Sequence, residues 1–163
     1  EGVWPLEFTC RFGYPGFAIL GSLHEEGWGS IFKAMTLGDR HEIMTKDGLS
    51  IGVVVTVPSF PYRDGYDELG KGTPVSFDDS MSEADMDELH FGEVAMSDGQ
   101  LVTAGLIGYV MVVTGIGGTI DAARADAYGR VSKVIIPNAR YRNDIGSRFE
   151  SDCATLRRLG WLP

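Results

Sequence analysis

The stretch from residue 49 to residue 57 constrains the fold of this chain most strongly, because it is the run richest in β-branched side chains. From Ile51 to Val57 it reads IGVVVTV, without regular alternation of apolar and polar residues. Such a continuous run is typical of a strand buried on both faces. With 163 residues, 44% of them hydrophobic, the chain can build a core around this strand as one large domain or two small ones.

The net charge of −9 argues against a nucleic-acid binder, because neutralising phosphates requires clustered Lys and Arg. The charge is unevenly distributed along the chain. Residues 64–98 hold 11 acids and one base, whereas from Arg124 onward eight bases face four acids. We therefore expect an anionic ligand to lie nearer the two ends of the chain than its middle.

Cys10 and Cys153 are too few for a disulfide scaffold, and we expect both thiols to be reduced. No apolar run approaches the ~18 residues of a membrane span, and no signal peptide opens the chain. These features predict a cytoplasmic protein without a membrane partner. The first residue is Glu1 rather than Met, so we expect a processed start or a piece of a longer protein.

The part of the chain after residue 41 has the pattern of a mostly β domain within an α+β fold. Ser97-Asp98-Gly99-Gln100 is typical of a hairpin turn. Thr119 or Asp121 is placed to cap a helix over Ile120–Ser132. Shorter elements are also expected: strands at 75–77, 90–96, 101–103, 106–114 and 133–136, and a helix at 150–159.

The first forty residues show a strand pattern followed by a helical one. Over Val3–Phe12, apolar and polar side chains alternate, which predicts a strand with one polar face. Apolar spacing over Phe17–Thr36 favours a helix, with a weak point at residues 27–29. We place a boundary between residues 1–40 and residues 41–163.

The polar face of the first strand carries Glu7, Thr9 and Arg11, about 6.6–7 Å apart at two-residue spacing. A carboxylate within a strand is unfavourable unless it is paired or bound to metal. One interpretation is a structural ion pair between Glu7 and Arg11. The other is a hard-cation site, because Mg²⁺ takes one or two carboxylates plus phosphate oxygens, and Arg11 would bind phosphate or carboxylate in a fork.

A second polar cluster lies in PNARYRNDIGSRF, residues 137–149, and contains Arg140, Arg142, Asp144 and Arg148. One interpretation is a surface loop held by salt bridges. The other is an anion-binding loop that folds back near Arg11. Composition alone does not decide between them.

Familiar catalytic and metal-binding motifs are absent. Residues 115–119 (GIGGT) predict a strand-to-helix turn, because a dinucleotide loop would need glycine where Ile120 stands. His24, His41 and His90 lie on separate expected elements, without zinc-ligand spacing. No nucleophile elbow occurs either.

Several blocks, in order, resemble the phosphoribosylamine–glycine ligase (glycinamide ribonucleotide synthetase) family of ATP-grasp enzymes. LEFTCRFGYP (residues 6–15) is similar to the family's E-F-N-x-R-F-G-D-P-E segment. SDGQLVTAG (97–105) is similar to its D-G-x-x-x-T-x-G hairpin, and YRNDIG (141–146) to its Y-R-x-D-I-G signature. Residues 90–92 stand where the family has H-A-G, and residues 112–134 resemble its strand–turn–helix.

The resemblance implies both a fold and an activity. Residues 1–40 would be the last strand and helix of an ATP-grasp domain, and residues 41–163 a β-rich C-terminal domain resembling a barrel-sandwich or rudimentary hybrid. The activity would be ATP-dependent joining of an amine to a carboxylate in purine biosynthesis, with Mg²⁺ or Mn²⁺. This portion alone is expected to be inactive and to bind no cofactor, since small-molecule substrates would bind together with upstream domains.

The resemblance also implies roles for individual residues. Glu7 and Thr9 would bind the metal, and Glu7 and Arg11 the ATP–metal complex, with Arg11 catalytic. The candidate substrate residues are Gly13, Tyr14, Arg142 and Asp144.

Four positions depart from the family pattern. Thr9 replaces a metal-binding Asn, Tyr14 and Gly16 replace the acids of G-D-P-E, and Tyr109 stands near the Arg of G-G-R-V. These departures leave two alternatives open: an ATP-grasp ligase with a different amine or acid, and a degenerate, non-catalytic assembly domain.

Overall fold

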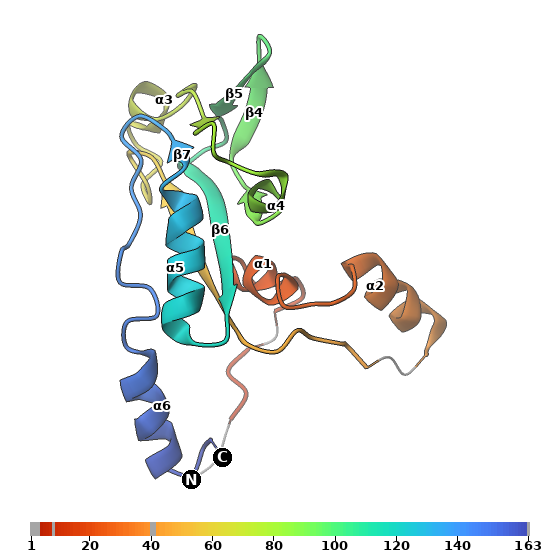
Figure 1. Cartoon of the computed structure of the whole chain (residues 1–163). Coiled ribbons are helices and arrows are strands. Elements are labelled where there is room, and N and C mark those ends of the chain that lie inside the picture. Colours follow the sequence, from red (N-terminus) through yellow and green to blue (C-terminus); the bar gives the residue numbers. More distant parts are fainter. Residues whose placement is uncertain (1–3, 8, 40–41, 163) are drawn as a thin grey trace.

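The centre of the fold is a three-stranded antiparallel sheet with the order β1-β6-β3. The computed structural model describes residues 4–7, 9–39 and 42–162 (Figure 1). β1 (Leu49–Thr56) pairs along its length with β6 (Tyr109–Gly117), and β3 (Leu89–Phe91) pairs with the other edge of β6. The buried strand predicted at residues 49–57 is confirmed over Leu49–Thr56, because Val53 and Val55 on one face are at most 1% exposed and Gly52 on the other face is buried as well.

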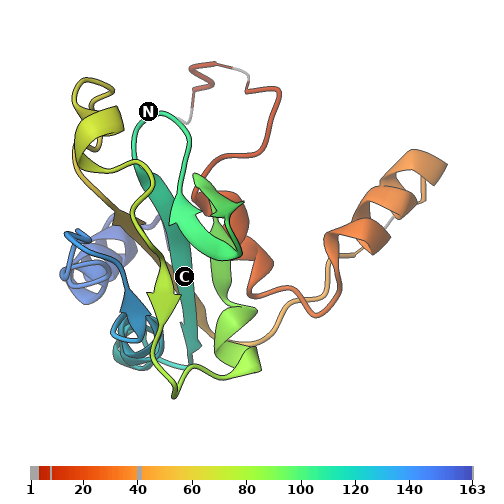
Figure 2. The same ribbon diagram turned by 90° about the horizontal axis from the view of Figure 1, so that it is seen from above.

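Helices cover both faces of the β1–β6 pair (Figure 2). α5 (Ile120–Val131) packs on one face, where an added Cβ at Gly115 would lie 2.3 Å from the Ala127 nitrogen. α1 (Gly16–Gly21) packs on the other face, where a Cβ at Gly52 would lie 2.5 Å from the Ile19 side chain. One glycine in each strand thus admits a helix on each side of the pair.

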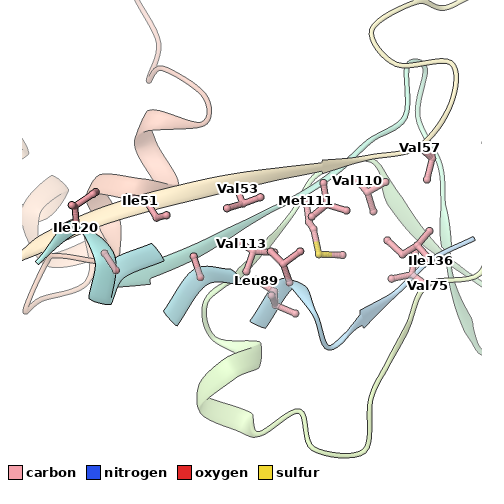
Figure 3. Close-up of a cluster of buried hydrophobic side chains, with 14 of the residues drawn as sticks. Ile51, Val53, Val57, Val75, Leu89, Val110, Met111, Val113, Ile120 and Ile136 are labelled. Carbon is pink, nitrogen blue, oxygen red and sulfur yellow. The ribbon is translucent and has the colours of Figure 1, made fainter. Parts of the chain in front are cut away.

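The hydrophobic core lies mainly between the sheet and α5 (Figure 3). The strands contribute alternate residues to it, so Ile51, Val53, Met111 and Val113 point the same way. The buried residues labelled in the close-up are Ile51, Val53, Val57, Val75, Leu89, Val110, Met111, Val113, Ile120 and Ile136.

Two small antiparallel sheets complete the domain. β2 (Ser76–Phe77) pairs with β7 (Val134–Ile135), and β4 (Val94–Ser97) pairs with β5 (Gln100–Thr103). The predicted hairpin turn is confirmed, because Asp98 (φ 49°) and Gly99 (φ 78°) both take the left-handed conformation that this turn requires. The expected strand over residues 90–96 is interrupted, since the chain leaves β3 for the hairpin at Gly92, whose added Cβ would lie 2.7 Å from the Tyr109 oxygen.

The remaining helices are short, and together with the small antiparallel sheets they give a mixed α+β arrangement. α3 (Tyr66–Leu69) and α4 (Glu83–Met86) are one-turn helices that the sequence patterns did not predict. α6 (Phe149–Arg158) lies close to the predicted position. The Thr119 cap of α5 is confirmed, with its hydroxyl accepting a hydrogen bond from the Ala122 N–H at 3.2 Å.

The helix expected over Phe17–Thr36 is two helices, α1 and α2 (Trp28–Leu37). The break falls just before the predicted weak point, and Gly38 ends α2 with a φ of 72°. The proposed boundary residues Arg40 and His41 lie outside the described residues.

The strand predicted over Val3–Phe12 is not formed by residues 4–7 or 9–12 (Val3 and Phe8 lie outside the described residues). The alternating pattern is present, but an extended segment becomes a strand only when a neighbouring strand pairs with it. No described residue pairs with this segment. In the described part of the chain, no helix is long and apolar enough to cross a membrane.

We predict that Gly115→Ala destabilises the domain by roughly 1–3 kcal/mol, because the new methyl group overlaps the α5 backbone. Gly129→Ala is the matched control. Gly129 lies on the exposed side of α5 with no atom within 4 Å of an added Cβ, so alanine should stabilise the helix by about 0.5–1 kcal/mol. Urea unfolding of the two variants measures both effects, and changes of the same sign would contradict the close packing.

Candidate functional site

The N-terminal arm, which we define as residues 4–47 apart from residues 8, 40 and 41, attaches to the domain through α1. The hydroxyl oxygens of Ser22 in the arm and Ser50 in β1 lie 2.8 Å apart. The Lys46 Nζ donates a hydrogen bond to the Ser22 carbonyl at 3.0 Å. Beyond this attachment, α2 extends away from the body of the domain (Figure 1).

A pocket of about 480 Å³ lies between the arm and the end of the sheet that carries β3. Its wall combines aromatic and ionisable side chains. The aromatic ones are Tyr14, Phe17, Trp28 and Phe91. Besides Tyr14, the ionisable side chains of the wall are Lys46, Asp87, Glu88 and His90. A pocket with apolar walls and a few polar groups is the usual form of a small-molecule site.

Tyr14 links the arm to the domain through an aromatic contact. Its ring centroid lies 5.1 Å from that of Tyr109, which in turn lies 5.8 Å from that of Phe60. Two causes raise the pKa of Tyr109 to about 12: mainly burial, and to a smaller extent the nearby Tyr14. This phenol therefore stays protonated. Its buried hydroxyl has no hydrogen-bond partner among the described residues.

The Glu93 side chain binds the backbone of the loop that leads into Tyr109. Its carboxylate accepts four backbone N–H hydrogen bonds, from Leu106 (3.0 Å), Ile107 (3.0 Å), Gly108 (2.7 Å) and Tyr109 (3.1 Å). Burial alone would raise the pKa of Glu93, but the four N–H donors together bring that pKa below its ordinary value. A loop of converging N–H groups is an anion-binding arrangement, and here a side chain of the same domain fills it.

On the α1 face of the sheet, His90, Thr114 and Glu88 form a polar chain. The His90 Nε2 lies 3.1 Å from the Thr114 Oγ1. The Thr114 hydroxyl also meets the Glu88 carboxylate, and it lies 3.2 Å from the Glu88 backbone oxygen. Burial lowers the pKa of His90, while the Glu88 charge acts in the opposite direction. The imidazole is therefore neutral at neutral pH.

The candidate residues at the start of the arm do not converge on a site in the described part of the chain. Glu7, Thr9, Arg11 and Gly13 are all exposed. The Arg11 Nη1 donates to the Phe12 oxygen at 3.1 Å, and no salt bridge joins it to Glu7. The ion pair considered for these two residues is thus not formed, because each side chain is solvated separately.

The described residues do not provide a complete metal site. They contain no group of three or more His, Cys, Asp or Glu side chains that could hold a metal ion. Glu7 supplies one exposed carboxylate and Thr9 one exposed hydroxyl, which fall short of the oxygen ligands that Mg²⁺ requires.

The loop with Arg142 and Asp144 contains an exposed salt bridge, in line with the first of its two interpretations. Arg142 forms a bidentate pair with Asp144, with distances of 2.8 and 2.7 Å. The loop is attached to α5, whose Tyr128 hydroxyl donates to the Arg142 carbonyl at 2.7 Å. Arg140 and Arg142 nevertheless line a second hollow of about 360 Å³, together with Phe60. Phe60 is the ring that also contacts Tyr109.

The comparisons with known proteins agree with this architecture. Residues 50–148 match the family described as "Phosphoribosylglycinamide synthetase, C domain". The chain belongs to this family. The phosphoribosylamine–glycine ligase of Mycobacterium bovis is 34% identical over 146 residues, which cover 88% of this chain and 32% of that protein. The corresponding ligase of Corynebacterium ammoniagenes is 30% identical over 153 residues, which cover 92% of this chain and 34% of that protein.

A solved structure shows the same arrangement. The phosphoribosylamine–glycine ligase of Thermotoga maritima matches with a TM-score of 0.69 and 28% identity, over 85% of this chain and 32% of that one. The chain therefore spans about a third of the length of the relatives that it matches.

The structure brings together two of the departures noted in the sequence. Tyr14 stands where the resemblance expects an acid and Tyr109 near an expected arginine, and their rings are in contact. An aromatic pair thus lies where the family pattern leads us to expect opposite charges.

Sequence reasoning missed several polar residues of the pocket, because they are far apart in the chain. His90 was set aside for lack of a metal-ligand spacing, and Glu88, Thr114 and Lys46 carried no motif. The only available signal was the similarity of residues 90–92 to H-A-G. The polar chain of His90 depends on strand pairing, which puts Thr114 on the same face.

We predict that Glu93→Gln destabilises the domain by roughly 1–3 kcal/mol at neutral pH, because an amide offers a single oxygen and no charge to four N–H donors. The pKa of Glu93 is lowered in the folded state. Its contribution is therefore present above the unfolded-state pKa and is lost as the pH falls through the folded-state pKa. Urea unfolding at several pH values should show the difference from the wild type shrinking in acid.

The control for this prediction is Glu68→Gln, since Glu68 is an exposed residue of α3. It should unfold like the wild type at every pH. A Glu93→Gln deficit that stays the same in acid would show that the carboxylate charge does not hold the loop.

Proposed function

We propose that the chain is the C-terminal part of an ATP-dependent carboxylate–amine ligase of the phosphoribosylamine–glycine ligase type, working in cytoplasmic purine biosynthesis. The observation that carries the proposal is that matches to named ligases cover 88–92% of the chain but only about a third of each ligase. The remaining elements of such an enzyme would belong to the upstream part. On this proposal, the chain by itself is inactive.

In this proposal the arm completes an ATP-grasp domain and the rest forms the β-rich C-terminal domain, similar to a barrel-sandwich or rudimentary hybrid. Support comes from the apolar side chains that the arm leaves in solvent: Trp4 is 79% and Leu6 98% exposed. Met35 and Leu37 of α2 are 67% and 66% exposed. Exposed apolar groups of this size mark a surface that another part of the protein covers.

The same arrangement would give the exposed polar residues of the arm a partner. Once residues 4–12 pair with upstream strands, Glu7 would supply one carboxylate to Mg²⁺ or Mn²⁺, and Thr9 a weaker oxygen ligand. Arg11 would bind the ATP phosphates. Gly13 and Tyr14, and Arg142 with Asp144, would lie near the substrates.

A second candidate is a ligase of the same chemistry with a different amine or acid. The observation in its favour is the Tyr14–Tyr109 contact, with ring centroids 5.1 Å apart, which puts an aromatic pair beside the pocket that Tyr14 lines. A panel of amines and acids tested with the complete ligase separates the two candidates. Full activity with phosphoribosylamine and glycine would exclude the second.

We predict that Glu7→Gln in the complete ligase lowers ATP-dependent turnover at least about tenfold, since the variant loses a charged metal ligand and about 1.4 kcal/mol suffices for that factor. Phosphate release measured with increasing Mg²⁺ should show a higher Mg²⁺ requirement. Glu68→Gln, exposed on α3, is the matched control and should keep wild-type turnover. Undiminished turnover of Glu7→Gln would exclude the metal-ligand role.

We also predict that the chain alone gives no heat of ATP·Mg²⁺ binding in calorimetry, because the described residues hold no complete metal site. The complete ligase should bind ATP·Mg²⁺ under the same conditions. Binding by the chain alone would show that the nucleotide site is misplaced in our proposal. Failure of the complete ligase to bind would favour the alternative of a degenerate, non-catalytic assembly domain.

A further inference from the structure

The pocket contains a histidine whose protonation pattern can be read from its neighbours. His90 lies in β3 opposite Val112 of β6, on the sheet face that also carries Thr114 and Gly52. This is the face that α1 covers, so His90 lies in the pocket wall while its Nε2 approaches Thr114 at 3.1 Å.

The Thr114 hydroxyl has a single proton to donate. Its Oγ1 lies within hydrogen-bonding distance of the Glu88 carboxylate and, at 3.2 Å, of the Glu88 backbone oxygen. A backbone carbonyl oxygen can only accept a hydrogen bond, and the carboxylate oxygen is an acceptor as well, so the hydroxyl proton points to Glu88. Towards His90, Thr114 can then only accept. The Nε2 of His90 must carry the hydrogen in this contact.

The other ring nitrogen, Nδ1, is then the unprotonated one in the neutral imidazole. No described residue hydrogen-bonds the Nδ1 of His90, and this atom is not buried. We infer that the Nδ1 of His90 is a hydrogen-bond acceptor presented to the pocket, and that it binds the N–H of a small primary amine or ammonium group.

The charges around the pocket favour such a donor over an anion. Asp87 and Glu88 contribute two carboxylates. The one lysine, Lys46, already donates to the Ser22 carbonyl at 3.0 Å. Carboxylate or phosphate oxygens would meet these acids and would bring no proton to an acceptor nitrogen.

The aromatic wall also suits an amine. Phe17 and Trp28, whose rings stack with centroids 4.3 Å apart, form an apolar wall for the alkyl part of the amine. Tyr14 stays protonated, because burial raises its pKa, and its hydroxyl points to the His90 carbonyl at 3.5 Å. The inference deepens the proposed function. Amine binding is argued from the pocket alone, and only the statement that this amine is a substrate of the ligase rests on the proposed function.

The tautomer is tested on the chain itself by long-range ¹H–¹⁵N NMR, with the His90 signals assigned by their loss in His90→Gln. Through the ordinary histidine range, about pH 5 to 8, we expect titration below the usual pKa and, at neutral pH, a hydrogen on Nε2. Thr114→Val removes the acceptor and should produce a mixture of tautomers, which Thr114→Ser should restore. A hydrogen on Nδ1, or a tautomer unchanged in Thr114→Val, would overturn the inference.

The ligand class is tested with methylammonium chloride and, at equal ionic strength, sodium acetate. We expect methylammonium to shift the Nδ1 signal of His90, and about tenfold weaker binding in His90→Gln as measured by the other pocket resonances. His24→Gln is the matched control, because His24 packs against Trp28 at 4.4 Å but is not part of the polar chain. Equal shifts with acetate, or no shift with methylammonium, would overturn the assignment.

These outcomes are independent of ligase activity. A complete ligase that lacks turnover would contradict the proposed function and leave the NMR result intact. A failed NMR test would remove the amine site and leave the proposed function standing.

Discussion

The antiparallel pairing of β1 with β6 is the interaction on which the rest of the structure depends. Both strands are buried, so each face needs a cover, and glycines allow helices to approach closely. Gly115 brings α5 against one face and Gly52 brings α1 against the other. The core side chains of Figure 3 fill the α5 side, whereas the α1 side keeps polar groups such as Thr114 and Ser50. The pocket lies on this polar side because the arm covers it only in part.

A single carboxylate connects this core to the candidate site. Glu93 holds the loop before β6, and that loop positions the Tyr109 ring. Tyr109 then packs against Tyr14, which belongs to the turn following the exposed Glu7 and Arg11. The C-terminal domain can therefore orient the part of the arm for which we propose metal and phosphate contacts. This gives the domain a role in the proposed reaction even though it carries no complete metal site among its described residues.

Local sequence patterns predicted an element correctly where the residues that stabilise it lie within the same short stretch. The apolar run over 49–57, the Asp98-Gly99 turn and the Thr119 cap each depend on neighbours within a few residues. Local sequence patterns failed where the element needs a pairing partner from a distant part of the chain. The segment from Trp4 to Phe12 alternates like a strand, yet no described residue pairs with it. The family resemblance was also visible in the sequence, because its short motifs stand in the right order.

The sequence by itself determined the buried strand, the helices α5 and α6 and the membership of the family, since each is written in local or ordered patterns. Only the tertiary structure decided which partners the polar residues contact. It separated Glu7 from Arg11 and paired Arg142 with Asp144. It also placed His90 next to Thr114, because strand register brings together residues that lie 24 positions apart in the chain. Hydrogen-bond partners of this kind are fixed by packing, and no local pattern encodes them.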